Sequence, residues 1–290
     1  MQAAMTIEDR ISQRFSGLSE KLQLAATYVA EHPIDIATRS LRAVAASSGV
    51  SPATFSRLAR ALGYDSYEDM REDGRAAVGR KMVPFSKRAQ ALRAEGTGQE
   101  GLTFLHRQAA ACLANITLLD RGISNQRLEE AVAALHAART VLLVGSLGSA
   151  GFVDYFGYLA QWFRHGWLVA SPGGTTLAGA LARMDHRDAI FVLSKAPYAS
   201  RSIRVLRAAR GKGITTVVIT DSHASPALEF ADHAFVVPTE SPQFFSSYTA
   251  TLVLIETLIS LLLARSGPEA EEMIREAENQ IHRLDETWKP

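Results

Sequence analysis

Five short apolar runs in the second half of the chain constrain its fold most. They cover residues 141–144, 167–170, 189–193, 216–219 and 234–237. They are rich in β-branched residues, and helical patterns lie between most of them. Strands that are apolar throughout and are separated by helices predict a parallel sheet covered on both faces. We therefore expect a doubly wound, flavodoxin-like α/β domain with a five-stranded parallel sheet. Its ligand site should lie beyond the C-terminal ends of the strands.

The first 80 residues follow a different pattern, in which apolar residues recur only at helical spacing. Four short helices are expected there, each bounded by Ser, Gly or Pro. The chain thus divides into an all-α helix-turn-helix bundle over 1–80, a linker and connecting helix over 81–123, and the α/β domain over 124–290. Within the middle part, residues 102–119 predict one helix.

Residues 40–63, SLRAVAASSGVSPATFSRLARALG, have the pattern of a helix-turn-helix. The small, hydroxyl and arginine residues of the second helix suit contacts to bases and phosphates. Residues 36–64 contain four arginines and no acid, which is the charge expected next to phosphate. The alternative is a plain helical bundle with solvated arginines. Contacts to double-stranded operator DNA are expected from Arg39, Arg42, Ser51, Pro52, Ala53, Thr54, Ser56, Arg57 and Arg60.

Composition excludes several other classes of protein. The formal net charge is +1, so basic character can only be local. Cys112 is the single cysteine, which excludes an intramolecular disulfide and fits a reducing cytoplasm. The N-terminus lacks the pattern of a secretory signal. The longest apolar stretch, 250–264, contains Glu256 and is short for a bilayer core of about 30 Å. A cytoplasmic protein without a membrane partner is expected.

These motifs resemble the RpiR/MurR family of bacterial transcription regulators over nearly the whole chain. At the N-terminus the resemblance rests on Leu18-Ser19, on residues 49–54 with Arg57, and on residues 62–64. At the C-terminus it rests on residues 219–222, 225–226 and 231–232. The resemblance implies a helix-turn-helix domain followed by a SIS (sugar isomerase) domain. It also implies a homo-oligomer, dimer or tetramer, that binds palindromic operators and senses a phosphorylated sugar or related metabolite.

The loop after the first strand, residues 145–151, suits an anion because glycines and a helix N-terminus expose N–H groups. By resemblance Ser149 is the serine of the first phosphate loop, and Leu147 stands where glycine is usual. Residues 194–201, SKAPYASR, stand where sugar-phosphate SIS domains resemble Ser-x-Ser-Gly-x-Thr, and only Ser194 matches. Pro197 removes a backbone donor there. A small anionic effector, phosphorylated and sugar-like by resemblance, is expected at Gly145, Ser146, Gly148, Ser149, Ser194, Lys195, Ser200, Arg201 and Ser246.

Other readings of the second domain stay open. Ser246 or Ser247 could instead cap the following helix. A sugar-phosphate isomerase needs a base, which neither loop contains; Glu240 is the nearest candidate by family pattern and Asp154 the next. A ligand-free assembly domain is the third class. The glycine spacing and Ser171 argue against dinucleotide binding. Because the loops lack a base and a recognition helix has no role in an isomerase, we expect that the chain is not an enzyme. Metal-ligand spacing is absent, so we also expect no metal and no cofactor. Residues 102–119 and 250–264 are the expected oligomer surfaces.

Overall fold

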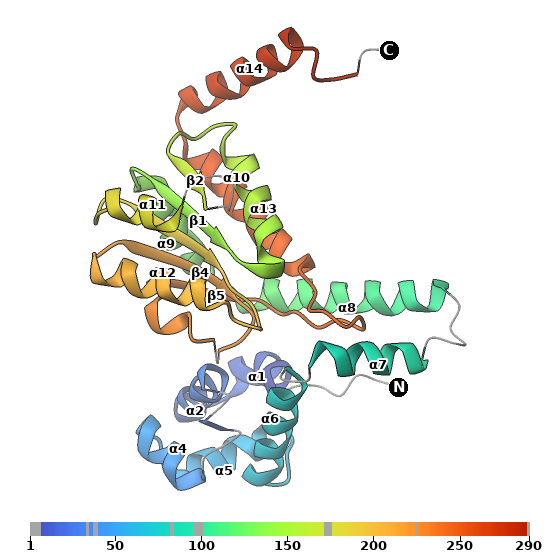
Figure 1. The fold of residues 1–290 in the computed structure, drawn as a ribbon. Helices are drawn as coiled ribbons and strands as arrows, with labels where there is room; N and C mark the ends of the chain where they lie inside the picture. The colour runs from blue at the N-terminus through green and yellow to red at the C-terminus, as the bar shows by residue number, and fades with distance from the viewer. Residues whose placement is uncertain are drawn as a thin grey trace. The chain divides into compact units, whose positions relative to one another are not determined.

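A computed structural model describes residues 7–32, 35–36, 40–81, 84–95, 101–170, 176–223 and 225–288. The chain divides into two compact units (Figure 1). Unit 1 contains residues 1–122 with the short segments 222–224 and 238–247. Unit 2 contains residues 123–221, 225–237 and 248–290. Each unit is described by itself.

The described residues of unit 1 up to Gly122 form helices joined by short turns, as the N-terminal pattern predicts, and the segment 238–247 of this unit is a loop. Ser40 and Ser51 begin two helices, because their Oγ atoms accept the N–H groups of Ala43 and Thr54, both at 3.3 Å. Gly49 lies between these helices with a φ of 68°, a conformation that favours glycine. The elements are α1 (Ile7–Arg14), η1 (Phe15–Gly17), α2 (Glu20–Glu31), α4 (Leu41–Ser48), α5 (Pro52–Ala61), α6 (Tyr67–Lys81), α7 (Phe85–Glu95) and α8 (Gly101–Gly122).

The core of the helix-turn-helix bundle holds α5 by its apolar face. Phe55, Leu58 and Leu62 are fully buried. The ring of Phe55 meets Tyr28 and Tyr67 edge to face, at centroid distances of 6.1 and 6.3 Å. Because one face of α5 is fixed in this core, its opposite face is left on the surface.

Helix α8 packs against the segment 238–247 of the same unit. The side-chain amide of Asn115, which is completely buried, donates to the carbonyl oxygen of Glu240 at 2.7 Å. The Oδ1 of Asn115 accepts the backbone N–H of Glu240 at 3.1 Å. On the same face of α8, Cys112 contacts Ser247 one turn before Asn115, and Gln108 contacts Ser241 two turns before it. The connecting helix predicted over 102–119 therefore exists, and one side of it is occupied.

Unit 2 contains a five-stranded, all-parallel sheet with the order β2-β1-β3-β4-β5 (Figure 1). This order is that of the flavodoxin-like fold, so the predicted fold class is confirmed. Strands β1 and β3 are neighbours from which the order runs in opposite directions, and ligands of such sheets bind at this switch point. The elements are α9 (Asn125–Ala137), β1 (Val141–Gly145), η2 (Leu147–Ser149), α10 (Ala150–Ala160), β2 (Trp167–Val169), α11 (Leu177–Arg183), β3 (Ala189–Leu193), α12 (Ser200–Gly211), β4 (Thr215–Thr220), η3 (Leu228–Phe230), β5 (His233–Val236), α13 (Thr249–Arg265) and α14 (Pro268–Arg283).

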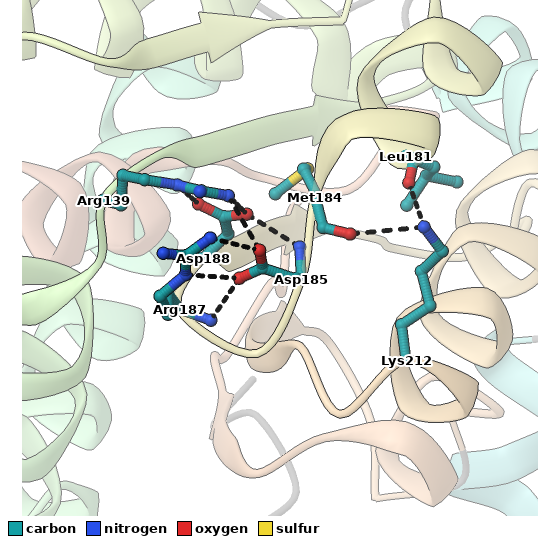
Figure 2. A network of polar contacts seen from close by, with 7 residues as sticks. All are labelled: Arg139, Leu181, Met184, Asp185, Arg187, Asp188 and Lys212. Atoms are coloured by element: carbon teal, nitrogen blue, oxygen red, sulfur yellow. Dashed lines mark hydrogen bonds and ion pairs between the residues drawn. The ribbon is translucent and has the colours of Figure 1, made fainter.

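The N-terminal edge of the sheet is held by an ionic network (Figure 2). Arg139, just before β1, donates to both carboxylate oxygens of Asp188, just before β3, at 2.9 and 2.6 Å. Asp185 accepts hydrogen bonds from Arg187, and its own N–H is bound by Asp188 at 2.8 Å. Lys212 donates to two carbonyl oxygens at the end of α11. The network fixes the strand starts, opposite to the end at which the ligand site is expected.

The apolar stretch predicted over 250–264 is α13, several of whose residues are fully buried in unit 2. Among the described helices none is by itself long and apolar enough to cross a membrane. Helices α13 and α14 meet that test only as a pair, and a bend of 115° separates them.

Candidate DNA-binding and ligand-binding sites

The exposed face of α5 carries most of the residues predicted to contact DNA. Ser51, Pro52, Ala53, Arg57 and Arg60 are exposed. Ser56 is half-buried, and Arg42 is exposed on α4. Within the described residues the arginines at 42, 57 and 60 make no ion pair, so their charge is available to a partner.

Two other arginines of unit 1 have structural roles at the opposite end of α5. Arg10 and Arg14 donate to the carbonyl oxygens of Leu62 and Ala61, at 3.1 and 3.0 Å. Cations at a helix C-terminus satisfy its last carbonyl groups and its dipole. These arginines of α1 thereby fix the end of α5 and leave the N-terminal half of its exposed face unobstructed.

Thr54 does not fit the contact set predicted from the sequence. Its side chain is 4% exposed, and its hydroxyl lies 2.9 Å from the Oγ of Ser51. The physical reason is its place in the first turn on the core side of α5, where the N-cap bond and the core take up its side chain. Arg39, the ninth residue of that set, lies outside the described residues.

The predicted ligand residues Ser149 and Ser194 lie at the ends of the two strands of the switch point. Ser149 is 2% exposed, and its Oγ lies 3.0 Å from the hydroxyl of Tyr248. Ser194 is 3% exposed, and among the described residues its Oγ has no hydrogen-bond partner. A buried hydroxyl without a partner is costly, and its presence here is consistent with a group that arrives from outside.

Lys195 extends this cluster toward α13. It is 5% exposed, and its Nζ donates to the Oγ1 of Thr251 at 2.5 Å. The same nitrogen lies 3.9 Å from the centroid of the Tyr248 ring, a cation–π arrangement. Burial lowers the pKa of Lys195 to about 7, against the opposing effect of Asp221. Burial also raises the pKa of Tyr248.

Asp221 lies directly after β4, and the loop that follows β3 binds its carboxylate. It is 4% exposed, and its two carboxylate oxygens accept the N–H of Ala196 at 3.2 Å and the hydroxyl of Tyr198 at 3.1 Å. The 194–201 loop thus directs one backbone donor and one side-chain donor at a carboxylate of the protein itself. Together with Pro197, which has no N–H, this leaves the loop less able to cradle a phosphate.

Three other predicted ligand residues are placed differently from Ser149 and Ser194. Ser200 and Arg201 are exposed at the start of α12. Of the two cations predicted here, Lys195 is buried and Arg201 is exposed. Ser246 is half-buried in the segment 238–247 of unit 1. The helix-cap alternative is wrong, because Tyr248 precedes α13 and no side chain caps that helix.

The backbone of the first loop, residues 145–151, is constrained by packing and by one left-handed residue. A Cβ on Gly145 would lie 2.6 Å from the carbonyl oxygen of Ser149 and 2.7 Å from Val153, so packing alone requires glycine there. Leu147 has a φ of 55°, in the left-handed region, which explains why glycine suits this position. Gly148 is exposed and Ser146 half-buried, and the Oγ of Ser146 accepts a hydrogen bond from Ser202 at 3.3 Å.

The carboxylates considered for an isomerase lie outside the strand-end cluster, by which we mean Ser146, Ser149, Ser194, Lys195, Asp221, Tyr248 and Thr251. Asp154 is exposed on α10. Glu240 is exposed in the segment 238–247, where Asn115 binds its backbone. Over the described ranges no three His, Cys, Asp or Glu side chains are grouped as metal ligands would be.

Sequence reasoning missed Asp221, Tyr248 and Thr251 as members of this cluster. Asp221 follows a strand, so the rule that located Ser194 could have located it too. Tyr248 and Thr251 carry no such signal, because only the packing of α13 brings them to the ends of β1 and β3.

Comparison with known proteins identifies both parts of the chain. Residues 5–73 match the family described as the helix-turn-helix domain of the rpiR family, and residues 135–261 match the SIS domain. A Haemophilus influenzae protein named as an uncharacterized HTH-type transcriptional regulator is 24% identical over 242 residues, 81% of each chain. The Bifunctional protein glk of Burkholderia thailandensis is 26% identical over 278 residues, which are 93% of this chain but 42% of that protein.

Two solved structures share the fold. The sugar isomerase domain of an RpiR transcription factor from Sphaerobacter thermophilus is 24% identical, with a TM-score of 0.56 over 59% of this chain and 96% of that one. The Vibrio vulnificus NanR protein, solved in complex with ManNAc-6P, is 20% identical, with a TM-score of 0.57 over 96% of this chain and 99% of that one.

Proposed function

Because the chain belongs to the RpiR family of helix-turn-helix regulators, with a SIS domain after its DNA-binding domain, we propose that it is a transcriptional regulator that binds operator DNA through α5 and senses a small anionic metabolite. The observation that carries the first half is the exposed, acid-free face of α5. The arginines at 57 and 60 lie on it, and the capped N-terminus of the helix points the small residues Pro52 and Ala53 outward. A helix with this surface can enter the major groove with its N-terminal residues at the base edges.

The second half of the proposal is supported by the strand-end cluster. Ser149, Ser194 and Lys195 bring two buried hydroxyls and a buried amine to the switch point of the sheet. An anion bound there would accept hydrogen bonds from the serines and find an opposite charge in Lys195. In the family a phosphorylated sugar is the expected ligand, and the NanR relative was solved with such a compound.

The departure of the 194–201 loop from the family pattern leaves the anionic group open. Asp221 already takes the N–H of Ala196 and the hydroxyl of Tyr198. Candidate effectors should therefore include both sugar phosphates and sugar acids. Binding of each compound is measured as a shift of the melting temperature of the chain. Because a ligand stabilises the state that it binds, a compound at 100 times its Kd adds about 2.7 kcal/mol. If every compound leaves the melting temperature unchanged, the ligand-free assembly domain is favoured.

DNA binding is tested by fluorescence anisotropy with a duplex from upstream of the gene for this chain. Specific binding should be 10³-fold or more tighter than binding to a random duplex, on the order of 4 kcal/mol. The logarithm of the binding constant should fall linearly with the logarithm of the salt concentration. Equal affinity for both duplexes would argue against an operator at that locus.

An isomerase is the competing function. It needs a base beside the substrate, and both candidate carboxylates, Asp154 and Glu240, are exposed. Asp221 is buried, but its oxygens are engaged by the loop after β3. We therefore propose that the chain catalyses no reaction. Turnover of sugar phosphates by the purified chain that disappears in Glu240→Gln would contradict this.

A further inference from the structure

The loop after β3 binds a carboxylate of the protein at a place where parallel sheets commonly bind a phosphate. The backbone N–H of Ala196 and the hydroxyl of Tyr198 donate to Asp221, at 3.2 and 3.1 Å, and Asp221 is 4% exposed. Pro197 lies between these two donors and has no N–H. Phosphate sites at the end of a strand are built from such loop donors together with the start of the next helix. Two donors of this loop are therefore occupied by an internal anion.

The loop after β1 also directs backbone donors at its own residues. The N–H of Ser149 donates to the carbonyl oxygen of Ser146 at 3.1 Å, and the N–H of Ala150 donates to that of Leu147. These bonds form the short turn η2 that comes before α10. Four donors, two in each loop, can thus reach a ligand only if a hydrogen bond within the protein breaks. A phosphate group has three strong acceptor oxygens and depends most on such donors.

The charges of the strand-end cluster suit a ligand with one negative charge better than a ligand with two. The charged side chains of the cluster are Lys195 and Asp221, both buried. Burial lowers the pKa of Lys195 to about 7, so at neutral pH its amine carries less than one full positive charge. A phosphate monoester brings a charge of about −1.5 to −2 at pH 7, whereas a carboxylate brings a single negative charge. Since like charges repel strongly where water is excluded, Asp221 opposes a phosphate more than a carboxylate.

One buried group of the cluster is suited to an acceptor that comes from outside. Ser194 is 3% exposed, and among the described residues its Oγ has no hydrogen-bond partner. It directly precedes Lys195, whose amine is a donor and, when protonated, a cation. Lys195 lies against the ring of Tyr248, whose hydroxyl contacts Ser149. A carboxylate has two acceptor oxygens and one negative charge, which match a site of hydroxyl donors with one cation.

We propose that Asp221 keeps phosphate out of the strand-end cluster, and that the effector is a sugar acid whose carboxylate binds to Lys195 and the serine hydroxyls. Asp221 determines specificity in two ways, because it occupies donors that a phosphate would need and adds a like charge. The hydroxyls of Ser146 and Thr251 both donate and accept, as partners of sugar hydroxyl groups must. This assignment of the effector rests on the proposed function, because it concerns the same site.

The first experiment compares matched ligands on the parent chain by isothermal titration. The pairs are glucose 6-phosphate with glucuronate, galactose 6-phosphate with galacturonate, and mannose 6-phosphate with mannuronate, so each pair shares a sugar and differs in the anionic group at C6. In the pair that fits the site, the uronate should bind at least about 10-fold more tightly than the phosphate. A phosphate that binds as tightly as its uronate, or more tightly, overturns the proposal and leaves the proposed function intact. If no compound of either kind binds, the proposal fails together with the ligand-binding half of the proposed function.

The second experiment removes the charge of Asp221 and keeps its shape. In Asp221→Asn the ratio of phosphate affinity to uronate affinity should rise at least about 10-fold, because the like charge is gone. Asp232→Asn is the matched control: Asp232 also accepts a backbone N–H and a hydroxyl, both from Thr216, at 2.8 and 2.9 Å, but at the opposite end of β4.

Melting curves should show both variants folded. A ratio that is unchanged in Asp221→Asn, or that rises equally in Asp232→Asn, overturns the role of Asp221. If Asp221→Asn does not fold, the matched ligands on the parent chain decide the proposal alone.

Discussion

The Nζ of Lys195 lies 3.9 Å from the ring centroid of Tyr248, and the hydroxyl of Tyr248 lies 3.0 Å from the Oγ of Ser149. This chain of contacts joins the ends of β3 and β1 through the residue that precedes α13. Phe152 stacks on the other face of the Tyr248 ring, at 4.1 Å and nearly parallel. An anion that engages Lys195 or Ser149 must compete with Tyr248. Ligand binding and the start of α13 are therefore coupled in this account.

Two replacements of Lys195 should show how much the charge of its amine contributes to binding of the effector. An anion binds best to the protonated amine, so affinity for the effector should fall as the pH rises above about 7. Lys195→Arg keeps the charge at every pH and should remove this dependence, while Lys195→Met should weaken binding throughout. Isothermal titration between pH 6 and 9 measures it. A parent chain with a flat profile would contradict the role of Lys195.

The same lysine gives a prediction that needs no ligand. Its folded-state pKa, about 7, is lower than that of an unfolded lysine, about 10.4. The unfolded chain then binds more protons between these values, so the free energy of unfolding contributed by this group rises with pH over that window. Below pH 7 the contribution is constant. Denaturant melts at a series of pH values give the free energy of unfolding of the parent chain and of Lys195→Met. Above pH 7 this free energy should depend on pH with a different slope in the two proteins. Equal slopes would show that Lys195 titrates as an ordinary lysine.

Serine replacements test the ligand site without disturbing the DNA-binding unit. Ser149→Ala and Ser194→Ala should leave operator affinity without effector unchanged and raise the effector concentration needed for a response. Coupling free energies are typically about 1–3 kcal/mol, so the operator response should be about 5–150-fold in the parent chain. Ser200→Ala, at an exposed position, is the control. If the Ser149→Ala and Ser194→Ala variants both respond to the effector like the parent chain, the ligand binds elsewhere.

Two arginines of unit 1 should differ in the kind of DNA contact that they make. Arg57→Ala on α5 should cost about 1–3 kcal/mol for the operator and little for random DNA, as a base contact does. Arg42→Ala on α4 should weaken both and reduce the salt slope by about 0.9, as a phosphate contact does. Arg204→Ala, exposed on α12 of unit 2, is the control. Arg57→Ala with an operator affinity equal to the parent chain would remove this residue from the contact set.

Asp188 should stabilise the N-terminal edge of the sheet in a pH-dependent way. Burial raises its pKa, but the hydrogen bonds from Arg139 and from the Asp185 N–H outweigh this, and its pKa is lowered. Its contribution is therefore present above the unfolded pKa and is lost as the pH falls through the folded pKa. Asp188→Asn should cost about 1–3 kcal/mol at pH 7 and less in acid. Glu272→Gln, in an exposed pair, should change stability by less than about 0.5 kcal/mol.

Much of the fold follows from local chemistry that is visible in the sequence. The caps Ser40 and Ser51 bind backbone groups of near neighbours in the chain, so the sequence shows them. The strands of the sheet are buried on both faces, so they appear in the sequence as apolar runs. The contacts around Lys195 are different, because Thr251 is 56 residues away and only tertiary packing brings it there. Thr54 shows the same limit: the pattern places it on α5, and its burial decides that its hydroxyl serves the cap.

Recognition of operator DNA by α5 can be tested by selecting duplexes from a random library with the full chain. We expect enrichment of two related half-sites whose centres are one DNA turn, about 10–10.5 base pairs, or a multiple of it apart. A chain with both Arg57→Ala and Arg60→Ala should enrich nothing, while the Arg204→Ala control should select the same sites. If the parent chain enriches no sequence, or if the double variant selects the same half-sites, α5 does not read operator DNA.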